Sequence, residues 1–235
     1  MASGQLGRAL SQVGLKLDEL ALEQGAAALM AADARFGTLF AENGFPPLWR
    51  RSEGFATLIK IVLEQQVSLD SAAAAFANLE ETIGPVEPEP FLVIDDARLK
   101  RIGFSRQKAG YCRGIAEQCR EGTLDLDALG NLVDEVARQR LLAVRGIGPW
   151  TSDVYLLFAL GRADIWPSGD RALVVSMAES FGFAEVPSYD EADQLALGWQ
   201  PWRSVAARML WHSYLKRRGR SLHSSGRDDV TKKCQ

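Results

Sequence analysis

The stretch that decides the fold is Leu141–Asp170, which reads LLAVRGIGPWTSDVYLLFALGRADIWPSGD. It starts with a helical pattern, continues through Gly146, Ile147 and Gly148, and returns to a helical pattern at Pro149. Two glycines that flank one aliphatic residue allow a turn so tight that a second backbone can approach it. Because Gly148 and Pro149 suit the N-cap and the first position of a helix, the sequence predicts two helices joined by a tight hairpin.

The helix that follows the hairpin begins in a way that bears on function. The first backbone amides of a helix have no partners within the helix, and the helix dipole makes this end electropositive. Such an end is suited to bind a phosphate without any basic side chain. The alternative is a plain glycine-rich connector between helices, and the short Gly-x-Gly pattern by itself does not decide between the two.

Helical periodicity also dominates the rest of the chain, whereas the alternation typical of strands is scarce. We expect helices over residues 17–30, 36–40, 55–63, 68–83, 97–102, 105–120, 134–143, 149–160, 170–181, 191–197 and 201–216. Ser68, Ser105 and Asp134 are expected to cap helices, and a loop is expected from Gly84 to Pro90. The sequence therefore predicts an all-α fold.

Composition narrows the class of protein. The chain has 235 residues, of which 47% are hydrophobic and 24% charged, so a folded core is possible and wholesale disorder is excluded. Three cysteines cannot form a disulfide framework and favour a reducing compartment. No apolar run approaches the length of about 20 residues that a membrane span needs. We expect a cytoplasmic protein that does not contact a membrane.

Charge is distributed unevenly along the chain. The net charge is −3, yet residues 203–235 hold nine basic and two acidic residues, and the preceding part is acidic. A basic end on an acidic body favours a polyanionic partner. A solvated tail explains the same pattern equally well, and residues 219–235 are expected to be disordered.

Three further segments accompany the hairpin. They are Ile61–Ser68 (IVLEQQVS), Leu99–Ala109 (LKRIGFSRQKA) and Trp202–Trp211 (WRSVAARMLW). Together with the hairpin, and in this order between about residues 52 and 215, the chain resembles the helix-hairpin-helix DNA glycosylase superfamily. Within it, the resemblance is greatest to the alkylation-repair branch of 3-methyladenine DNA glycosylases of type II.

The resemblance implies two helical lobes around a cleft. Residues 52–165 would form the middle lobe with the hairpin at about 141–151, residues 1–51 and 166–218 would form the second lobe, and 219–235 would be a basic tail. The alkylation-repair branch has an additional N-terminal β-domain. Residues 1–51 show no strand pattern, so we expect that domain to be absent.

Asp170 is the expected catalytic residue. The family's catalytic aspartate falls on this position, just before a predicted helix whose N-terminus stabilises an ionised carboxylate. Cleavage of an N-glycosidic bond develops positive charge on the sugar, as glycoside hydrolysis does, and a carboxylate opposes that charge. The alternative role for Asp170 is that of a simple helix cap.

The resemblance also implies a base pocket. Bifunctional relatives place a Schiff-base lysine at the position of Trp150, so we expect a monofunctional enzyme. In the alkylation-repair branch a tryptophan lines the pocket there, and an indole face suits a cationic alkylated base. Trp211 matches a second pocket tryptophan. A pocket tyrosine of the branch falls on Val154 with Tyr155 beside it, which is a departure; either tryptophan could instead belong to the core.

Contacts to DNA are implied at five positions. Gly146, Gly148 and Thr151 would bind the phosphate backbone at the hairpin. A flipped base leaves a gap in the duplex that a side chain must fill, and Arg106 falls on the family's wedge position in place of the usual leucine. Gln66 matches a glutamine that faces the orphan base, although a polar residue at a helix end is nearly as good an explanation.

The family's hairpin also binds sodium or potassium through backbone carbonyls, which here would belong to Leu142, Val144 and Ile147. Iron–sulfur relatives need four clustered cysteines near the C-terminus, and only Cys234 lies there, so no cluster is expected. No organic cofactor is implied.

The resulting expectation is a DNA glycosylase that acts as a monomer on double-stranded DNA and removes 3-methyladenine, with 7-methylguanine as a further candidate. Alternatives are a glycosylase for uracil, hypoxanthine or mismatched bases, a non-catalytic DNA-binding module, and a helical interaction scaffold. The spacing of Gly146, Gly148 and Asp170 disfavours the last two.

Overall fold

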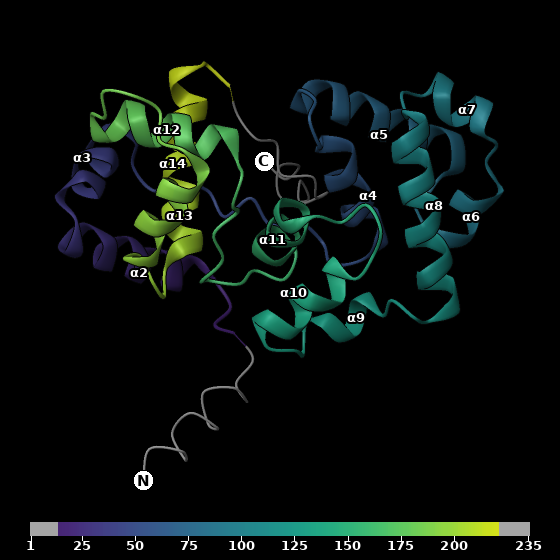
Figure 1. The fold of residues 1–235 in the computed structure, drawn as a ribbon, viewed down its shortest axis with the longest axis horizontal. Coiled ribbons are helices and arrows are strands. Elements are labelled where there is room, and N and C mark those ends of the chain that lie inside the picture. The colour runs from purple at the N-terminus through teal and green to yellow at the C-terminus, as the bar shows by residue number, and fades with distance from the viewer. Residues whose placement is uncertain (1–13, 221–235) are drawn as a thin grey trace, which may run out of the picture. The chain divides into compact units, whose positions relative to one another are not determined.

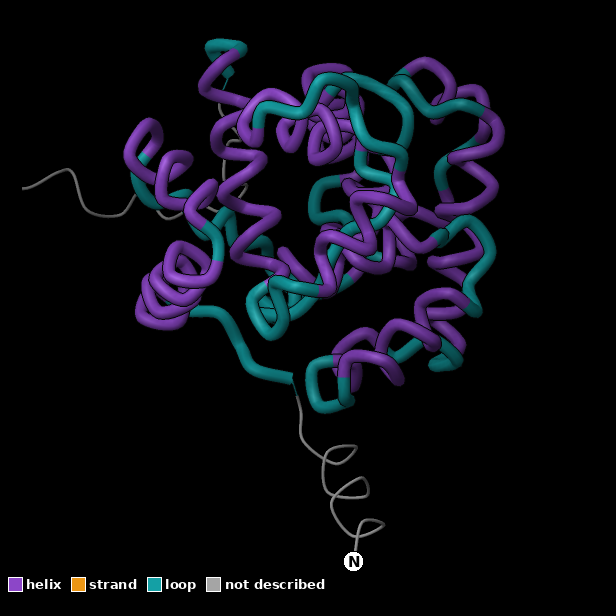
Figure 2. The backbone as a smooth tube through the Cα atoms, turned by 60° about the vertical axis from the view of Figure 1, so that its left-hand side comes forward, coloured by secondary structure: helices purple, strands orange, loops and turns teal. Residues whose placement is uncertain are grey.

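The computed structural model describes residues 14–220, which are helices joined by loops and turns (Figures 1 and 2). Within these residues the only strand-like pairing is one antiparallel bridge between Lys16 and Arg162. The all-α prediction is confirmed. The helices are α2 (Glu19–Ala32), α3 (Ala34–Asn43), α4 (Phe55–Glu64), α5 (Leu69–Ile83), α6 (Pro88–Val93), α7 (Asp96–Arg101), α8 (Arg106–Glu121), α9 (Leu126–Leu129), α10 (Asp134–Leu142), α11 (Pro149–Phe158), α12 (Arg171–Phe181), α13 (Tyr189–Leu197) and α14 (Arg203–Arg217).

The described residues form two compact units. Unit 1 consists of Gly14 and residues 53–156, and unit 2 consists of residues 15–52 and 157–220. The division after Leu156 lies within the last turn of α11, whereas the sequence placed it near residue 165. The expected cleft stays a prediction, and most of the expected tail, residues 221–235, lies outside the described residues.

Unit 1 is organised around α8, which packs against α4, α6 and α7, while α5 packs against α4 (Figure 1). The apolar stripe of α4 predicts this burial, because residues three and four apart share one face of a helix. Phe55 on α4 meets Phe91 on α6 with ring centroids 6.0 Å apart, and Phe91 meets Phe104 at 5.9 Å. Burying each such ring contributes about 2–3 kcal/mol.

Unit 2 is organised around α14, which packs against α12, α3 and α2. Its aromatic core joins Phe36 of α3 to Trp199 with ring centroids 5.2 Å apart, and to Phe181 of α12 at 5.4 Å. Small residues allow α14 a close approach, since Ala206 and Ala207 are fully buried. Phe181 is the last residue of α12, so this core holds one end of the helix whose other end is capped by Asp170.

Helix caps test the local predictions. Ser68 caps α5 by accepting the amide of Ser71, and Ser105 caps α8 by accepting the amide of Lys108, so both predicted caps are confirmed. The predicted cap at Asp134 is wrong by one position. The N-cap is Val133, and Asp134 is the first residue of α10, where its charge still complements the helix dipole.

The loop expected through Pro90 is also wrong, because α6 begins at Pro88. A proline in the first turn removes only an amide that has no partner within the helix, and its fixed φ suits helix entry. Residues 84–90 therefore contain a helix start as well as a helix end. The one-turn helix α9 (Leu126–Leu129) was not predicted, since four residues are too few to show a period.

Among residues 14–220, no helix combines the length and the apolar character that crossing a bilayer requires.

Candidate functional site

The predicted hairpin is present in unit 1. After α10, the amide of Val144 donates to the carbonyl of Leu141 at 3.0 Å, and the amide of Ile147 donates to that of Val144 at 3.1 Å. Helix α11 begins at Pro149 directly after the second glycine. Two helices joined by a hairpin of a few residues are thus confirmed.

The two hairpin glycines are needed for different reasons. Gly146 has a φ of +94°, which favours glycine, and a Cβ atom there would lie 2.3 Å from Cγ of Tyr111. At Gly148 a Cβ atom would meet nothing within 4 Å. Gly146 therefore lets α8 approach the hairpin, whereas Gly148 leaves space in which another molecule can approach the backbone.

A residue that the sequence analysis missed, Gln65, joins the hairpin to α4. Its side-chain amide donates to the carbonyl of Gly146 at 3.0 Å and to Oγ1 of Thr151 at 2.8 Å. Thr151 is only 2% exposed. Its side chain is therefore used within unit 1, and the DNA contact expected of Thr151 would have to come from its backbone amide.

Gln66 follows directly and faces solvent. Its φ of +55° places a non-glycine residue in the left-handed region, a conformation that is strained and tends to occur at functional sites. The ammonium of Lys108 holds the preceding backbone by donating to the carbonyls of Leu63 at 2.6 Å and Gln65 at 2.8 Å. Partial burial lowers the pKa of Lys108.

Arg106, the expected wedge residue, is the first residue of α8 and is exposed. It lies two positions before Lys108, whose ammonium binds two backbone carbonyls at the end of α4. The start of α8 is therefore held against the end of α4 within unit 1. The structure thus brings the segments of Arg106, Gln66 and the hairpin into one connected network. Their contacts with DNA stay predictions.

The carbonyls expected to hold a monovalent cation lie at the C-terminal end of α10 and in the hairpin. Leu142 is the last residue of α10, and the carbonyl of Val144 accepts the amide of Ile147. A carbonyl has a second lone pair, and the end of a helix carries partial negative charge, so this donor set fits a hard cation. Among the described residues, no cluster of three or more His, Cys, Asp or Glu side chains could hold a metal.

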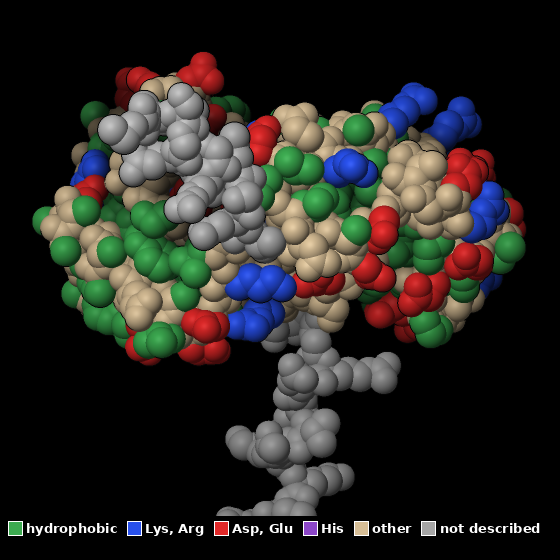
Figure 3. Space-filling model, turned by 90° about the horizontal axis from the view of Figure 1, so that it is seen from below, with side chains coloured by type: hydrophobic (Ala, Val, Ile, Leu, Met, Phe, Trp, Pro, Cys, Tyr) green, Lys and Arg blue, Asp and Glu red, His purple; other side chains and the backbone are tan. Residues whose placement is uncertain are grey.

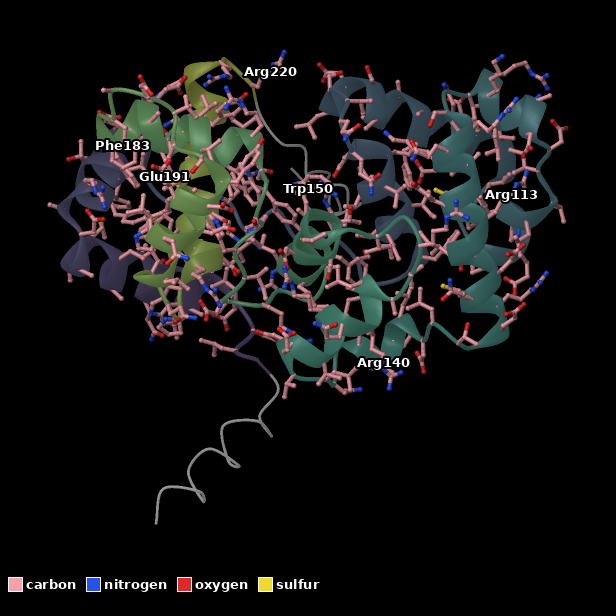
Figure 4. The ribbon with its side chains drawn as sticks, viewed as in Figure 1. Arg113, Arg140, Trp150, Phe183, Glu191 and Arg220 are labelled. Atoms are coloured by element: carbon pink, nitrogen blue, oxygen red, sulfur yellow. The ribbon has the colours of Figure 1, made fainter. Side chains whose placement is uncertain are left out.

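Two expected pocket residues lie on α11. Trp150 is half-buried in the first turn (Figure 4). Tyr155 is fully buried, and its hydroxyl accepts the amide of Gly54 at 2.9 Å, just before α4 begins. Burial raises the pKa of Tyr155 to about 12. Tyr155 therefore supports the start of α4, and its expected role in a base pocket stays a prediction.

In unit 2, Asp170 is the N-cap of α12 and is half-buried. One oxygen, Oδ1, accepts the amide of Leu173 at 3.0 Å and the indole N–H of Trp211 at 3.2 Å. Two donors on one carboxylate oxygen fix its orientation, and such bonds are strongest to the ionised form. The structure thus brings together Asp170 and Trp211, which are 41 residues apart in the chain.

The ring of Trp211 is held on its face as well. It stacks on Phe158 with centroids 5.3 Å apart and an angle of 21°, and the Arg208 guanidinium lies 5.0 Å from the Phe158 ring. Arg208 is buried and donates to the carbonyls of Leu48 and Leu157. Burial lowers the pKa of Arg208 to about 9. With one face covered and its N–H bound to Asp170, Trp211 is positioned rigidly; its role in binding a base stays a prediction.

Charges on the surface are mixed on the face shown in Figure 3, where acidic and basic side chains lie among apolar and uncharged ones. This distribution agrees with the net charge of −3. Among the described residues of this face, no charge of one sign dominates.

Residues 59–201 match the family described as HhH-GPD superfamily base excision DNA repair protein. A putative DNA-3-methyladenine glycosylase of Bacillus subtilis is 29% identical over 74% of this chain and 64% of its own length. DNA-3-methyladenine glycosylase 1 of Schizosaccharomyces pombe is 26% identical over 68% of this chain and 72% of its own length.

Solved structures agree with this result. A DNA-3-methyladenine glycosidase from Bacillus halodurans has a TM-score of 0.70 and 25% identity, covering 88% of this chain and 95% of that protein. A Schizosaccharomyces pombe 3-methyladenine DNA glycosylase in complex with abasic DNA has a TM-score of 0.75 at 24% identity, covering 80% and 95%, and supports the fold.

The matches differ in the share of each protein that they cover. The chain spans 64% and 59% of the length of two of the curated relatives that it matches. The family match, in contrast, covers more than half of this chain and includes the hairpin, Trp150 and Asp170. The chain therefore belongs to the HhH-GPD superfamily of base excision DNA repair proteins.

Proposed function

We propose that this protein is a base-excision-repair DNA glycosylase that hydrolyses the N-glycosidic bond of alkylated bases in double-stranded DNA. The expected substrates are 3-methyladenine and, as a further candidate, 7-methylguanine. The observation that carries the proposal is the carboxylate of Asp170, half-buried and oriented by Leu173 and Trp211 in unit 2. The names of the relatives support the substrate class.

The chemistry follows from charge. As the bond between sugar and base lengthens, positive charge develops on the sugar, and an oriented carboxylate stabilises it without reorganising. We propose that Asp170 also orients the attacking water. An alkylated base such as 3-methyladenine is already cationic and leaves as a neutral molecule, so no acid has to protonate it.

Binding of DNA is assigned to unit 1. The N-terminus of α11 and the open space at Gly148 suit a backbone phosphate. Gln66 is exposed in the turn after α4 and Arg106 is exposed at the start of α8, and both segments are tied to the hairpin, which supports contacts of these side chains near the damaged base pair. A sodium or potassium ion held by the carbonyls of Leu142, Val144 and Ile147 would bridge the hairpin to a phosphate.

The reaction is proposed to stop at base removal. Trp150 stands where bifunctional relatives have the lysine that forms a Schiff base, and an indole cannot take that role. Borohydride should therefore trap no adduct between the protein and DNA, and the abasic strand should stay uncut. An adduct that disappears when Asp170 is replaced would contradict the monofunctional assignment.

Asp170→Asn tests the central proposal. Asparagine caps a helix as well as aspartate does, so the melting temperature should change little. Loss of an oriented charge should slow single-turnover excision of 3-methyladenine by about 100-fold or more. Affinity for lesion DNA should persist, because phosphate contacts do not use this carboxylate. Excision at the wild-type rate would show that Asp170 is only a cap.

The same assay distinguishes the alternatives. Duplexes that contain uracil, hypoxanthine or a mismatch test other lesions, which the Val154 departure leaves open. Binding without excision on any duplex would indicate a non-catalytic module. We propose that the protein acts on DNA in the cytoplasm and that it does so as a monomer. Size-exclusion chromatography with and without DNA would test the oligomeric state.

A further inference from the structure

The turn that leads into Asp170 has little backbone support of its own. Within Trp166–Asp170, the amide of Ser168 donates to the carbonyl of Trp166 at 2.9 Å, and the amide of Asp170 donates to that of Pro167 at 3.3 Å. Gly169 is exposed and has a φ of +80°. Side chains that bind this turn therefore add to the two backbone bonds that fix where α12 begins.

Asp193 on α13 holds this turn with both carboxylate oxygens. The indole N–H of Trp166 donates to Oδ1 at 2.9 Å, and the hydroxyl of Ser168 donates to Oδ2 at 2.6 Å. The two donors lie on either side of Pro167, so one carboxylate fixes the turn before and after its proline. Hydrogen bonds to an ionised acceptor are about twice as strong as neutral ones.

Both partners of this arrangement are anchored elsewhere in unit 2. The ring of Trp166 is 8% exposed and meets Trp199 edge-on at 5.3 Å, within the aromatic core that includes Phe36. Helix α13 begins with a capping box in which Ser188 and Glu191 bond each other's backbone amides. Asp193 therefore joins a capped helix and a buried ring to the turn that leads into Asp170.

We propose that Asp193 is a positioning residue for the reaction at Asp170. Its carboxylate sets where the backbone of Asp170 starts α12, while Leu173 and Trp211 set where the carboxylate of Asp170 points. Asp193 acts through the turn and does not touch the substrate. This inference rests on the proposed function, because it gives Asp193 a role only in a reaction that uses Asp170.

Three variants and one control test the proposal. Asp193→Ala removes both bonds, Asp193→Asn keeps one neutral acceptor oxygen and replaces the other acceptor with an N–H donor, and Ser168→Ala removes one bond while leaving the Trp166 anchor intact. Glu179→Gln is the matched control, because Glu179 is a carboxylate of α12 that holds Arg218 with both oxygens in the same unit. Melting temperature, affinity for lesion DNA and the single-turnover excision rate are measured for each protein.

Misplacing a catalytic group by about 1 Å can cost about 100-fold in rate. We expect Asp193→Ala to slow excision about 10- to 100-fold at saturating enzyme, Asp193→Asn less, and Ser168→Ala about threefold. Affinity for lesion DNA should stay within about twofold, since it depends on phosphate contacts. Glu179→Gln should keep the wild-type rate even if its melting temperature falls.

A double variant separates positioning from general destabilisation. If Asp193 acts only through Asp170, adding Asp193→Ala to Asp170→Asn should produce no further loss of rate. An equal loss in both backgrounds, or wild-type rates for both Asp193→Ala and Ser168→Ala, would overturn the inference. Ser168→Ala keeps the test decisive if Asp193→Ala does not fold. Wild-type excision by Asp170→Asn would instead overturn the proposed function, so the two failures are distinguishable.

Discussion

The hairpin of unit 1 and the turn of unit 2 share a local plan. Each contains a glycine with a positive φ, Gly146 at +94° and Gly169 at +80°, and each leads directly into a helix. They differ in the residue that occupies the helix entrance. Helix α12 is capped by the carboxylate of Asp170, whereas the first turn of α11 carries no acidic residue.

This difference determines what each helix end can do. In α12 the electropositive end is occupied by the chain's own carboxylate, that of Asp170. The cap therefore holds this carboxylate in a fixed place. In α11 the corresponding end has no carboxylate of its own in the first turn and suits an anion from outside, such as a phosphate. In the proposed function, the same helix dipole would support catalysis in one unit and phosphate binding in the other.

The largest expected effect is on the free energy of unfolding, in which replacements of Gly146 and Gly169 should differ. In Gly146→Ala the new Cβ would overlap the ring of Tyr111 at 2.3 Å in addition to the unfavourable φ, so the free energy of unfolding should fall by about 3 kcal/mol. In Gly169→Ala nothing lies within 4 Å, and about 1 kcal/mol is expected from φ alone. Urea unfolding of both variants measures this; equal losses would contradict the comparison.

The next effect concerns Tyr155 on α11, which follows the hairpin. Its pKa is raised to about 12 by burial, so the unfolded chain loses this proton first as pH rises above 10. Stability contributed by the neutral phenol is full below pH 10 and should fall by about 2–3 kcal/mol by pH 12. Urea unfolding between pH 8 and 11.5 checks this direction.

The control is Tyr155→Phe. It should cost about 1 kcal/mol at neutral pH, because the amide of Gly54 loses its acceptor, and it should be less sensitive to alkali than the wild type. A variant that lost stability as steeply as the wild type above pH 10 would show that other groups cause the loss.

Trp211→Phe tests how the carboxylate of Asp170 is oriented in unit 2. Phenylalanine keeps the stacking on Phe158 but lacks the N–H that donates to Asp170. Loss of one bond to a charged group, about 1.5 kcal/mol, should slow single-turnover excision about tenfold. Affinity for undamaged DNA should not change. An unchanged rate would show that Leu173 alone is sufficient to orient the carboxylate.

The smallest effect is expected from Gln65→Leu in unit 1. It removes the donor to Gly146 and Thr151, so the hairpin should lose part of its fixed geometry and DNA affinity should fall about fivefold, or about 1 kcal/mol. The excision rate at saturating enzyme should be unchanged. Gln107→Leu is the control, since its amide bonds only the exposed hydroxyl of Tyr111. A rate defect without an affinity defect would reverse the roles assigned to the two regions.

Several features could be predicted because their signals are local. Ser68 and Ser105 as caps, Gly84 as the end of α5, the hairpin at Gly146 and Asp170 at the start of α12 all depend on residues within one turn of each other. The family resemblance added the catalytic expectation for Asp170. Local signals failed where two rules competed, as at Pro88, where a proline can end a helix or start one.

Cap, turn and period signals act over a few residues, and they were sufficient to predict that the chain is helical, where its hairpin lies and which carboxylate begins α12. Other features became clear only from how the helices pack: Gln65 binds the hairpin, Tyr155 is fully buried, Trp211 orients the carboxylate of Asp170, and Asp193 holds the turn before it. These contacts join residues 25 to 101 positions apart. They arise when helices pack, and a single sequence carries no signal for which distant side chains packing brings together.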